Sequence, residues 1–153
     1  MHFTVLYVME NQSLDQLKNR FGEEGVINKI YNEFGNLYCD GCGEWEPENF
    51  YICDWFQIGG RWLDLLPAKK GITGEGSFMR YTSNTNGNCS ICDIEDLDEN
   101  FDFEKTIYGV ATDTDYYETN WRDDSLTDDM KEWFNKIRTK QIKGVVALID
   151  CHS

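Results

Sequence analysis

Runs of apolar residues lie near both ends of the chain. Residues 3–8 and 144–150 are apolar at nearly every position. A strand with one face in water alternates apolar and polar residues, whereas a strand covered on both faces is apolar throughout. The two runs are therefore predicted to be neighbouring strands in the middle of a sheet.

Apolar residues recur at helical spacing in three other segments. Residues 14–21 follow a capping Ser13, residues 23–34 begin after an interruption at Gly22, and a third helix begins at Ser125 or Thr127 and ends near residue 140. Gly35 is placed to end the second helix. We expect three helices, the first two adjoining at Gly22.

The middle of the chain carries β-branched and aromatic segments. Residues 50–58, 78–81 and 106–112 are predicted strands, and the first of these is expected to end at Gly59-Gly60. Residues 116–121 fit a hairpin partner of the preceding strand and an aromatic loop equally well. The predicted fold class is α+β: one domain over residues 1–153, with helices packed on a mixed sheet of about five strands.

The overall charge limits the partners of this chain. It carries 28 acidic and 14 basic side chains, a formal net charge of −14. Direct binding to nucleic acid is not expected, because phosphate contacts need clustered Lys and Arg. The absence of a run of about 18 apolar residues, and of a signal-like start, predicts a cytoplasmic protein without a membrane partner.

Four cysteines form two pairs with the spacing of metal knuckles. They are Cys39 with Cys42 and Cys89 with Cys92, so the loops within residues 39–92 could supply four thiolates to one tetrahedral zinc. Such a site would be structural, since four sulfurs leave no open position on the ion. The alternative is free or redox-active thiols. Cys53 and Cys151 fall in predicted strands, as small buried apolar residues or as substitutes in the zinc site.

Carboxylates are concentrated in two segments. The residues singled out as a partner-binding acidic surface are Glu95, Asp96, Asp98, Glu99, Asp123 and Asp124. A run of like charges is ordinarily a solvated face. The functional alternative is a surface that imitates phosphates and occupies the basic groove of another protein.

The segment from Cys53 to Trp62 combines aromatic residues, a double glycine and an arginine. It contains no phosphate-binding loop motif. A ligand pocket here would use Asp54, Trp55, Gln57, Arg61 and Trp62. Packing is the favoured interpretation, with both tryptophans carried into the core.

Histidine, cysteine and aspartate also occur near the two ends of the chain. His2 and the run Asp150-Cys151-His152 admit a nucleophile and base. Residues at strand ends are more often partly exposed and without such a role, and neighbours on a strand point to opposite faces. No catalytic residue is assigned from the sequence.

Three segments carry a resemblance: His2 to Leu6, Asp54 to Trp62 and Leu148 to His152. Together they resemble a group of small uncharacterised proteins of bacteriophages and prophages. The resemblance implies a viral accessory protein in a bacterial cytoplasm and brings no established activity or site.

With the acidic surface, this resemblance favours a non-enzymatic function. The chain would bind and inhibit a basic host protein that binds nucleic acid or acts in defence, as anti-CRISPR proteins do. The alternative is a small-ligand or nucleotide-binding protein, or an enzyme, with a pocket in the segment Asp54 to Trp62. Asp54 or His152 would be the acid or base of such an enzyme.

Overall fold

Two long antiparallel strands form the centre of the protein. The computed structural model describes residues 1–40, 51–76, 88–120 and 122–153. Strands β1 (His2–Glu10) and β7 (Gly144–His152) pair along their whole lengths, from His2 opposite His152 to Glu10 opposite Gly144. The expectation that the two apolar runs are central neighbours is confirmed.

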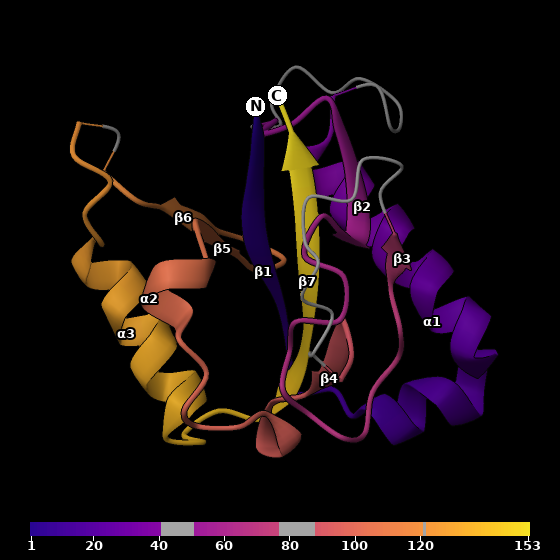
Figure 1. The fold of residues 1–153 in the computed structure, drawn as a ribbon. Helices are drawn as coiled ribbons and strands as arrows, with labels where there is room; N and C mark the ends of the chain where they lie inside the picture. The colour runs from indigo at the N-terminus through magenta and orange to yellow at the C-terminus, as the bar shows by residue number, and fades with distance from the viewer. Residues whose placement is uncertain (41–50, 77–87, 121) are drawn as a thin grey trace.

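The other elements extend this pair into an α+β fold (Figure 1). The sheet is mixed, with strand order β3-β2-β7-β1-β5-β6 and with β4 also paired to β7. The elements are α1 (Leu14–Tyr38), β2 (Trp55–Gly60), β3 (Glu75–Gly76), β4 (Ile91–Asp93), the 3-10 helix η1 (Ile94–Asp96), α2 (Phe103–Thr106), β5 (Gly109–Ala111), β6 (Tyr116–Glu118) and α3 (Asp128–Arg138). The described residues form seven strands where about five were predicted, because β3 and β4, of two and three residues, are too short to show a periodicity.

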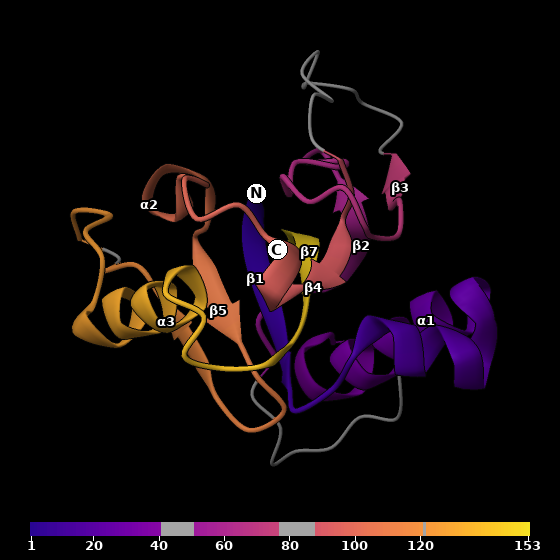
Figure 2. The ribbon, with the colours of Figure 1, turned by 90° about the horizontal axis from the view of Figure 1, so that it is seen from below.

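The sheet separates two hydrophobic clusters. Odd-numbered side chains of β1, such as Val5 and Tyr7, pack with α1 in the first cluster. Even-numbered side chains, such as Leu6 and Val8, pack in the second cluster with Phe103 of α2 and with α3. Figure 2 shows α1 and α3 on opposite sides of the central strands. Both faces of β1 and β7 are therefore covered, which explains their continuous apolar sequence.

Helix α1 has a break where the sequence predicts one. Gly22 has φ of 73° and is not helical, so two helical segments adjoin there. The prediction that Gly35 ends the second segment is wrong, because the helix continues to Tyr38. Gly35 is buried between Phe34 and Tyr38, which both pack in the first cluster. Their burial offsets the cost of about 1 kcal/mol for a glycine inside a helix.

Helix α3 agrees with its sequence signals. Thr127 is the N-cap, and its hydroxyl oxygen accepts a hydrogen bond from the Met130 amide at 3.3 Å. Asp128 and Asp129 occupy the first turn, where carboxylates are favoured by the helix dipole.

Three predicted strands need adjustment. The strand predicted over 50–58 is β2, which begins at Trp55 and contains Gly59 and Gly60 instead of ending before them. The strand over 106–112 is shorter, since residues 103–106 form α2. Residues 116–118 pair with β5, so the hairpin alternative is the correct one. The strand predicted over 78–81 lies outside the described residues.

Candidate functional site

The second face of the central strand pair becomes polar at one end. Successive residues of a strand point to opposite faces, so His2 and Thr4 continue the row of Leu6 and Val8. Asp150 and His152 continue the matching row on β7. This end of the strands also holds residue 1 and residue 153, which lie side by side (Figure 1). We call the group His2, Asp54, Asp150 and His152 the paired-histidine site.

Asp150 is the buried centre of this site. Its side chain is fully buried, and Oδ1 lies 2.8 Å from His2 Nδ1. Its other oxygen, Oδ2, accepts a hydrogen bond from the Arg61 backbone amide at 2.9 Å. A buried carboxylate is costly unless hydrogen bonds satisfy it, and here both oxygens have a partner.

The double glycine of β2 makes room for Asp150. Gly59 and Gly60 have φ of 87° and 53°, a region that favours glycine. A Cβ atom on Gly60 would lie 2.4 Å from Asp150 Oδ2. The sequence Gly-Gly-Arg therefore lets the chain approach the carboxylate closely enough for the Arg61 amide to reach it.

The second imidazole has a carboxylate of its own. His152 Nδ1 lies 2.9 Å from Asp54 Oδ1, an exposed group. The hydrogen bond from His152 lowers the pKa of the Asp54 carboxyl below its usual value. The His2 and His152 rings are in edge contact, with centroids 4.9 Å apart and planes at 72°.

These contacts fix the proton position on both neutral rings. A neutral imidazole has one nitrogen that donates and one that accepts, and a carboxylate can only accept. Nδ1 of each ring faces a carboxylate and therefore carries the hydrogen. The Nε2 atom of each ring is left with a lone pair, able to take a proton or bind a metal ion.

A surface depression of about 320 Å³ adjoins His2. Trp62 and Tyr108 supply aromatic walls, and charged residues occur in both signs. The hydroxyl oxygen of Thr119, a buried residue on this wall, makes no hydrogen bond of normal geometry. The lining residues are His2, Phe3, Thr4, Trp62, Glu104, Lys105, Thr106, Ile107, Tyr108, Thr119 and Asp124.

The pocket predicted from the segment Asp54 to Trp62 coincides in part with this site. Asp54 holds His152, the Arg61 amide holds Asp150, and Trp62 lines the depression. Gln57 is the register partner of Asp150, and its Oε1 is buried without a hydrogen-bond partner.

The favoured packing interpretation of the same segment is wrong for Trp55. That side chain is 42% exposed, while Phe56 beside it is buried. Trp55 is the register partner of His152, and its ring is in edge contact with the His2 ring, with centroids 6.2 Å apart.

The sequence assigned no favoured role to His2, Asp150 and His152, which are the centre of the site, and His152 was only an alternative acid or base. The expectation that these residues are partly exposed is wrong for Asp150, which is fully buried. Two features of the sequence could have indicated the site. Asp150 and His152 are two positions apart on one predicted strand, so their side chains must share a face. The first strand was predicted to be the neighbour of that strand, so His2 could be expected to lie near them.

Of the predicted zinc ligands, the three that the structure describes do not all lie in the same cluster. Cys39 packs in the first cluster with Cys53 and Cys151, whereas Cys89 and Cys92 pack in the second. Cys39 is disulfide-bonded, and Cys42 lies outside the described residues. Among the described residues no three His, Cys, Asp or Glu side chains form a metal-binding group. A zinc site formed by all four cysteines stays a prediction.

The second cysteine pair is a buried dithiol. Cys89 and Cys92 are free and fully buried. A hydrogen bond between the two thiols lowers the pKa of Cys89 and raises the pKa of Cys92. Cys53 and Cys151 are free and buried as well, in agreement with their expected packing role.

The two acidic segments lie at opposite ends of the molecule (Figure 1). Glu95, Asp98 and Glu99 are exposed near η1. Asp123 and Asp124 are exposed in the connection between β6 and α3. Asp96 is half-buried and lines, with Asp98, a depression that also contains Lys69 and Lys70.

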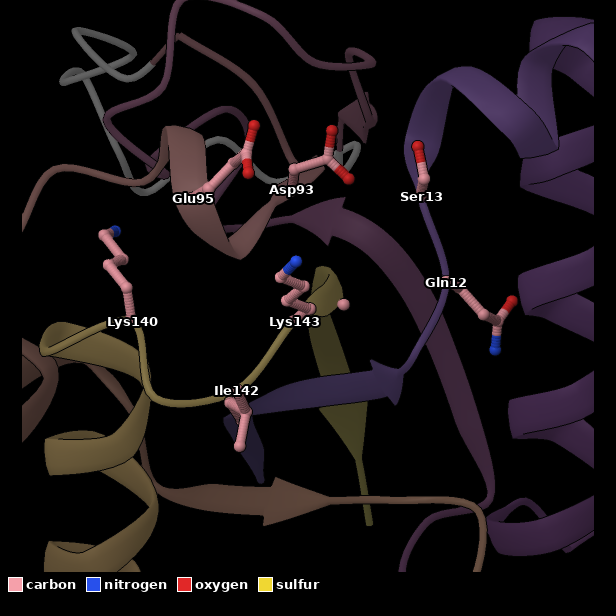
Figure 3. Close-up of a pocket in the computed structure, with 8 residues that line it drawn as sticks. Gln12, Ser13, Asp93, Glu95, Lys140, Ile142 and Lys143 are labelled. Atoms are coloured by element: carbon pink, nitrogen blue, oxygen red, sulfur yellow. The ribbon is translucent and has the colours of Figure 1, made fainter.

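A further depression, of about 190 Å³, lies at the other end of the central strands (Figure 3). Its charged groups serve the fold. Asp93 Oδ1 accepts a hydrogen bond from the Leu14 amide at 2.9 Å, at the start of α1. Lys140 Nζ donates to the Ile94 carbonyl oxygen at 2.6 Å and to that of Leu97. These bonds connect the start of α1 to β4 and the segment after α3 to η1, so we assign this depression no ligand.

Comparison with known protein families, curated proteins and solved structures found no match. None of the helices in the described ranges is both long and apolar enough to cross a membrane.

Proposed function

We propose that the protein binds a small polar ligand in the depression beside His2 and that His2 takes a proton from it. The observation that carries this proposal is the buried Asp150 carboxylate held between His2 Nδ1 and the Arg61 amide. A carboxylate so placed orients an imidazole and stabilises the imidazolium that forms when Nε2 accepts a proton.

The lining of the depression supports a ring-shaped, weakly charged ligand. The Trp62 and Tyr108 side chains offer faces on which a ring can stack. The Thr119 hydroxyl offers a buried hydrogen-bonding group. Glu104, Lys105 and Asp124 have a formal net charge of −1, which disfavours a ligand with several phosphates. Nucleosides and sugars fit this description.

Binding can be tested through the histidine signals of the protein. The chain has only two histidines, so the NMR spectrum of labelled imidazoles has two sets of signals. A nucleoside or sugar that binds should shift the His2 signals. Trp62→Ala should weaken that binding by ~10-fold or more, given that aromatic stacking contributes ~1–3 kcal/mol. Trp133→Ala, in a half-buried tryptophan of α3, is the matched control.

Arg61→Ala separates the two possible roles of Arg61. The backbone amide that holds Asp150 is retained in this variant, so the fold should be too. If the arginine side chain also contacts the ligand, binding is lost while the melting temperature stays close to that of the wild type. A panel of nucleosides and sugars that leaves every histidine signal in place would contradict the proposal.

A second candidate function is inhibition of a basic host protein, supported by the exposure of Glu95, Asp98 and Glu99 near η1. Such a chain would be a phage-derived anti-defence protein. Reversing the charges of Asp96, Asp98 and Glu99 to lysine should then weaken a salt-sensitive complex captured from host cells. Reversal of Asp15, Glu23 and Glu24, three exposed residues of α1, is the matched control. Equal loss in both variants would mean that the total charge matters and the surface does not.

A further inference from the structure

We propose that His2 and His152 together bind one divalent transition-metal ion through their Nε2 atoms. This site is distinct from the predicted cysteine site and contains both histidines of the chain. It does not require the small ligand of the proposed function, because the ion alone is the expected ligand; His2 Nε2 has one lone pair, so it acts as a base only where no ion occupies it.

The two imidazoles are placed as a chelating pair. His2 and His152 are register partners on antiparallel strands, so their side chains leave the sheet on the same face. The ring centroids are 4.9 Å apart. Nitrogen ligands lie about 2.0–2.1 Å from a zinc ion, so two imidazoles at this centroid separation can share one ion when both Nε2 atoms point to it.

Each imidazole also has the outer partner that metal-binding histidines require. A histidine ligand usually donates its second ring N–H to a carboxylate, which orients the ring and makes the free nitrogen a stronger ligand. Asp150 Oδ1 lies 2.8 Å from His2 Nδ1, and Asp54 Oδ1 lies 2.9 Å from His152 Nδ1. Both lone pairs are thus on Nε2, and both rings are held by carboxylates on neighbouring segments.

The site is open to solvent and leaves positions on the ion unfilled. The side chains of His2 and His152 are 15% and 40% exposed. The described residues provide no third protein ligand, so water would complete the coordination. Imidazole nitrogen favours zinc, nickel and copper over magnesium and calcium. An ion with open positions could also activate a bound water molecule.

The test uses zinc alone and protein with ¹⁵N-labelled histidine. Both Nε2 signals should shift together and stop shifting at one equivalent of zinc. Zinc bound by cysteine thiolates would leave these two signals in place. Unmoved imidazole signals in excess zinc, or a response from one histidine alone, would overturn the inference.

Substitution by asparagine gives matched variants. The asparagine amide can replace Nδ1–H as a donor to the carboxylate, but it has no equivalent of Nε2. H2N and H152N should each weaken zinc binding by at least ~10-fold, since even loss of an outer-shell partner costs ~10–100-fold. Zinc should raise the melting temperature of the wild type and of Cys89→Ser, but of neither histidine variant.

The outcome is decisive even if one variant is unstable. His152 and Asp54 are exposed enough that H152N is expected to fold, so its zinc affinity tests the inference without H2N. Unchanged affinity in H152N would overturn the chelating pair. If zinc does not bind while a nucleoside or sugar still shifts the His2 signals, this inference fails and the proposed function stands.

Discussion

The two faces of the central strand pair differ at the end that contains His2 and His152. On the α1 face, Phe3 and Cys151 continue the apolar row to the end of the strands, beside Phe56 of β2. On the other face, the row changes from Leu6 and Leu148 to His2, Thr4, Asp150 and His152. The same two strands therefore contribute a continuous core on one side and a polar group on the other.

This difference indicates which face is used for function. Apolar residues at the position of Asp150 would pack without the cost of burying a carboxylate, and such replacements are often neutral or stabilising. Instead, the chain keeps the carboxylate and uses a double glycine to bring an amide to it. Buried polar groups at positions where apolar residues would pack well are expected at functional sites.

The largest effect should come from the apolar face. Phe34 is fully buried in the first cluster, against Tyr7, Tyr38 and Phe56. Phe34→Ala should lower the free energy of unfolding by about 3–5 kcal/mol through lost burial and a cavity. Phe21→Ala, at a half-exposed position of the same helix, should cost less than about 1 kcal/mol. Urea denaturation measures both, and similar losses would contradict the assignment of Phe34 to the core.

Two tyrosines on the α1 face should make the stability of the protein fall at high pH. Burial raises the pKa of Tyr31 and of Tyr38 from 10.0 to about 12. A raised pKa stabilises the fold below pH 10 and this contribution is lost as the pH rises towards 12. After a discount for partial exposure, we expect a loss of about 2 kcal/mol between pH 10 and 12. Tyr31→Phe should make the stability less dependent on pH over this range, and an unchanged slope would contradict the tyrosine assignment.

On the polar face, the closest packing is at Gly60. Gly60→Ala places a methyl group against Asp150 Oδ2 at a φ that favours glycine, and we expect a loss of about 1–3 kcal/mol. Gly76→Ala is the control, since within the described part of the chain its Cβ would meet Leu63 Cδ2 at 3.5 Å and nothing closer. Thermal melting compares the two. A tolerated Gly60→Ala would mean that Asp150 is not held as described.

The smallest change in stability is expected when the carboxylate of Asp150 or Asp54 is replaced by an amide of the same shape. Asp150→Asn should cost about 1 kcal/mol, because a hydrogen bond to a charged group becomes a neutral one. The effect on His2 should be larger, since an amide can also donate and no longer fixes the ring proton. Asp54→Asn, at an exposed position, should leave the stability close to that of the wild type. Histidine spectra and urea denaturation of both variants check this order.

Much of the fold can be predicted from the sequence, because it depends on patterns within short segments of the chain. The apolar runs predict β1 and β7, the Thr127 cap and first-turn aspartates predict α3, and Gly22 predicts the break in α1. The short strands β3 and β4 could not be predicted, because their pairing depends on segments distant in sequence.

The site was predicted only in part. The segment Asp54 to Trp62 carried visible chemistry, but its meaning depends on Asp150, which is 89 positions from Arg61. The prediction did not take into account that alternate residues on adjacent strands lie on the same face of the sheet. The even-numbered residues His2, Thr4, Asp150 and His152 meet for that reason.

The proton position on the two imidazoles is the most direct test of the site. Long-range ¹H–¹⁵N spectra of histidine-labelled protein, recorded where both rings are neutral, distinguish a hydrogen on Nδ1 from one on Nε2. The carboxylates of Asp150 and Asp54 predict Nδ1–H on both rings, with Nε2 unprotonated. Nε2–H on both rings would contradict the paired-histidine site, and with it both the base assigned to His2 and the proposed metal ligands.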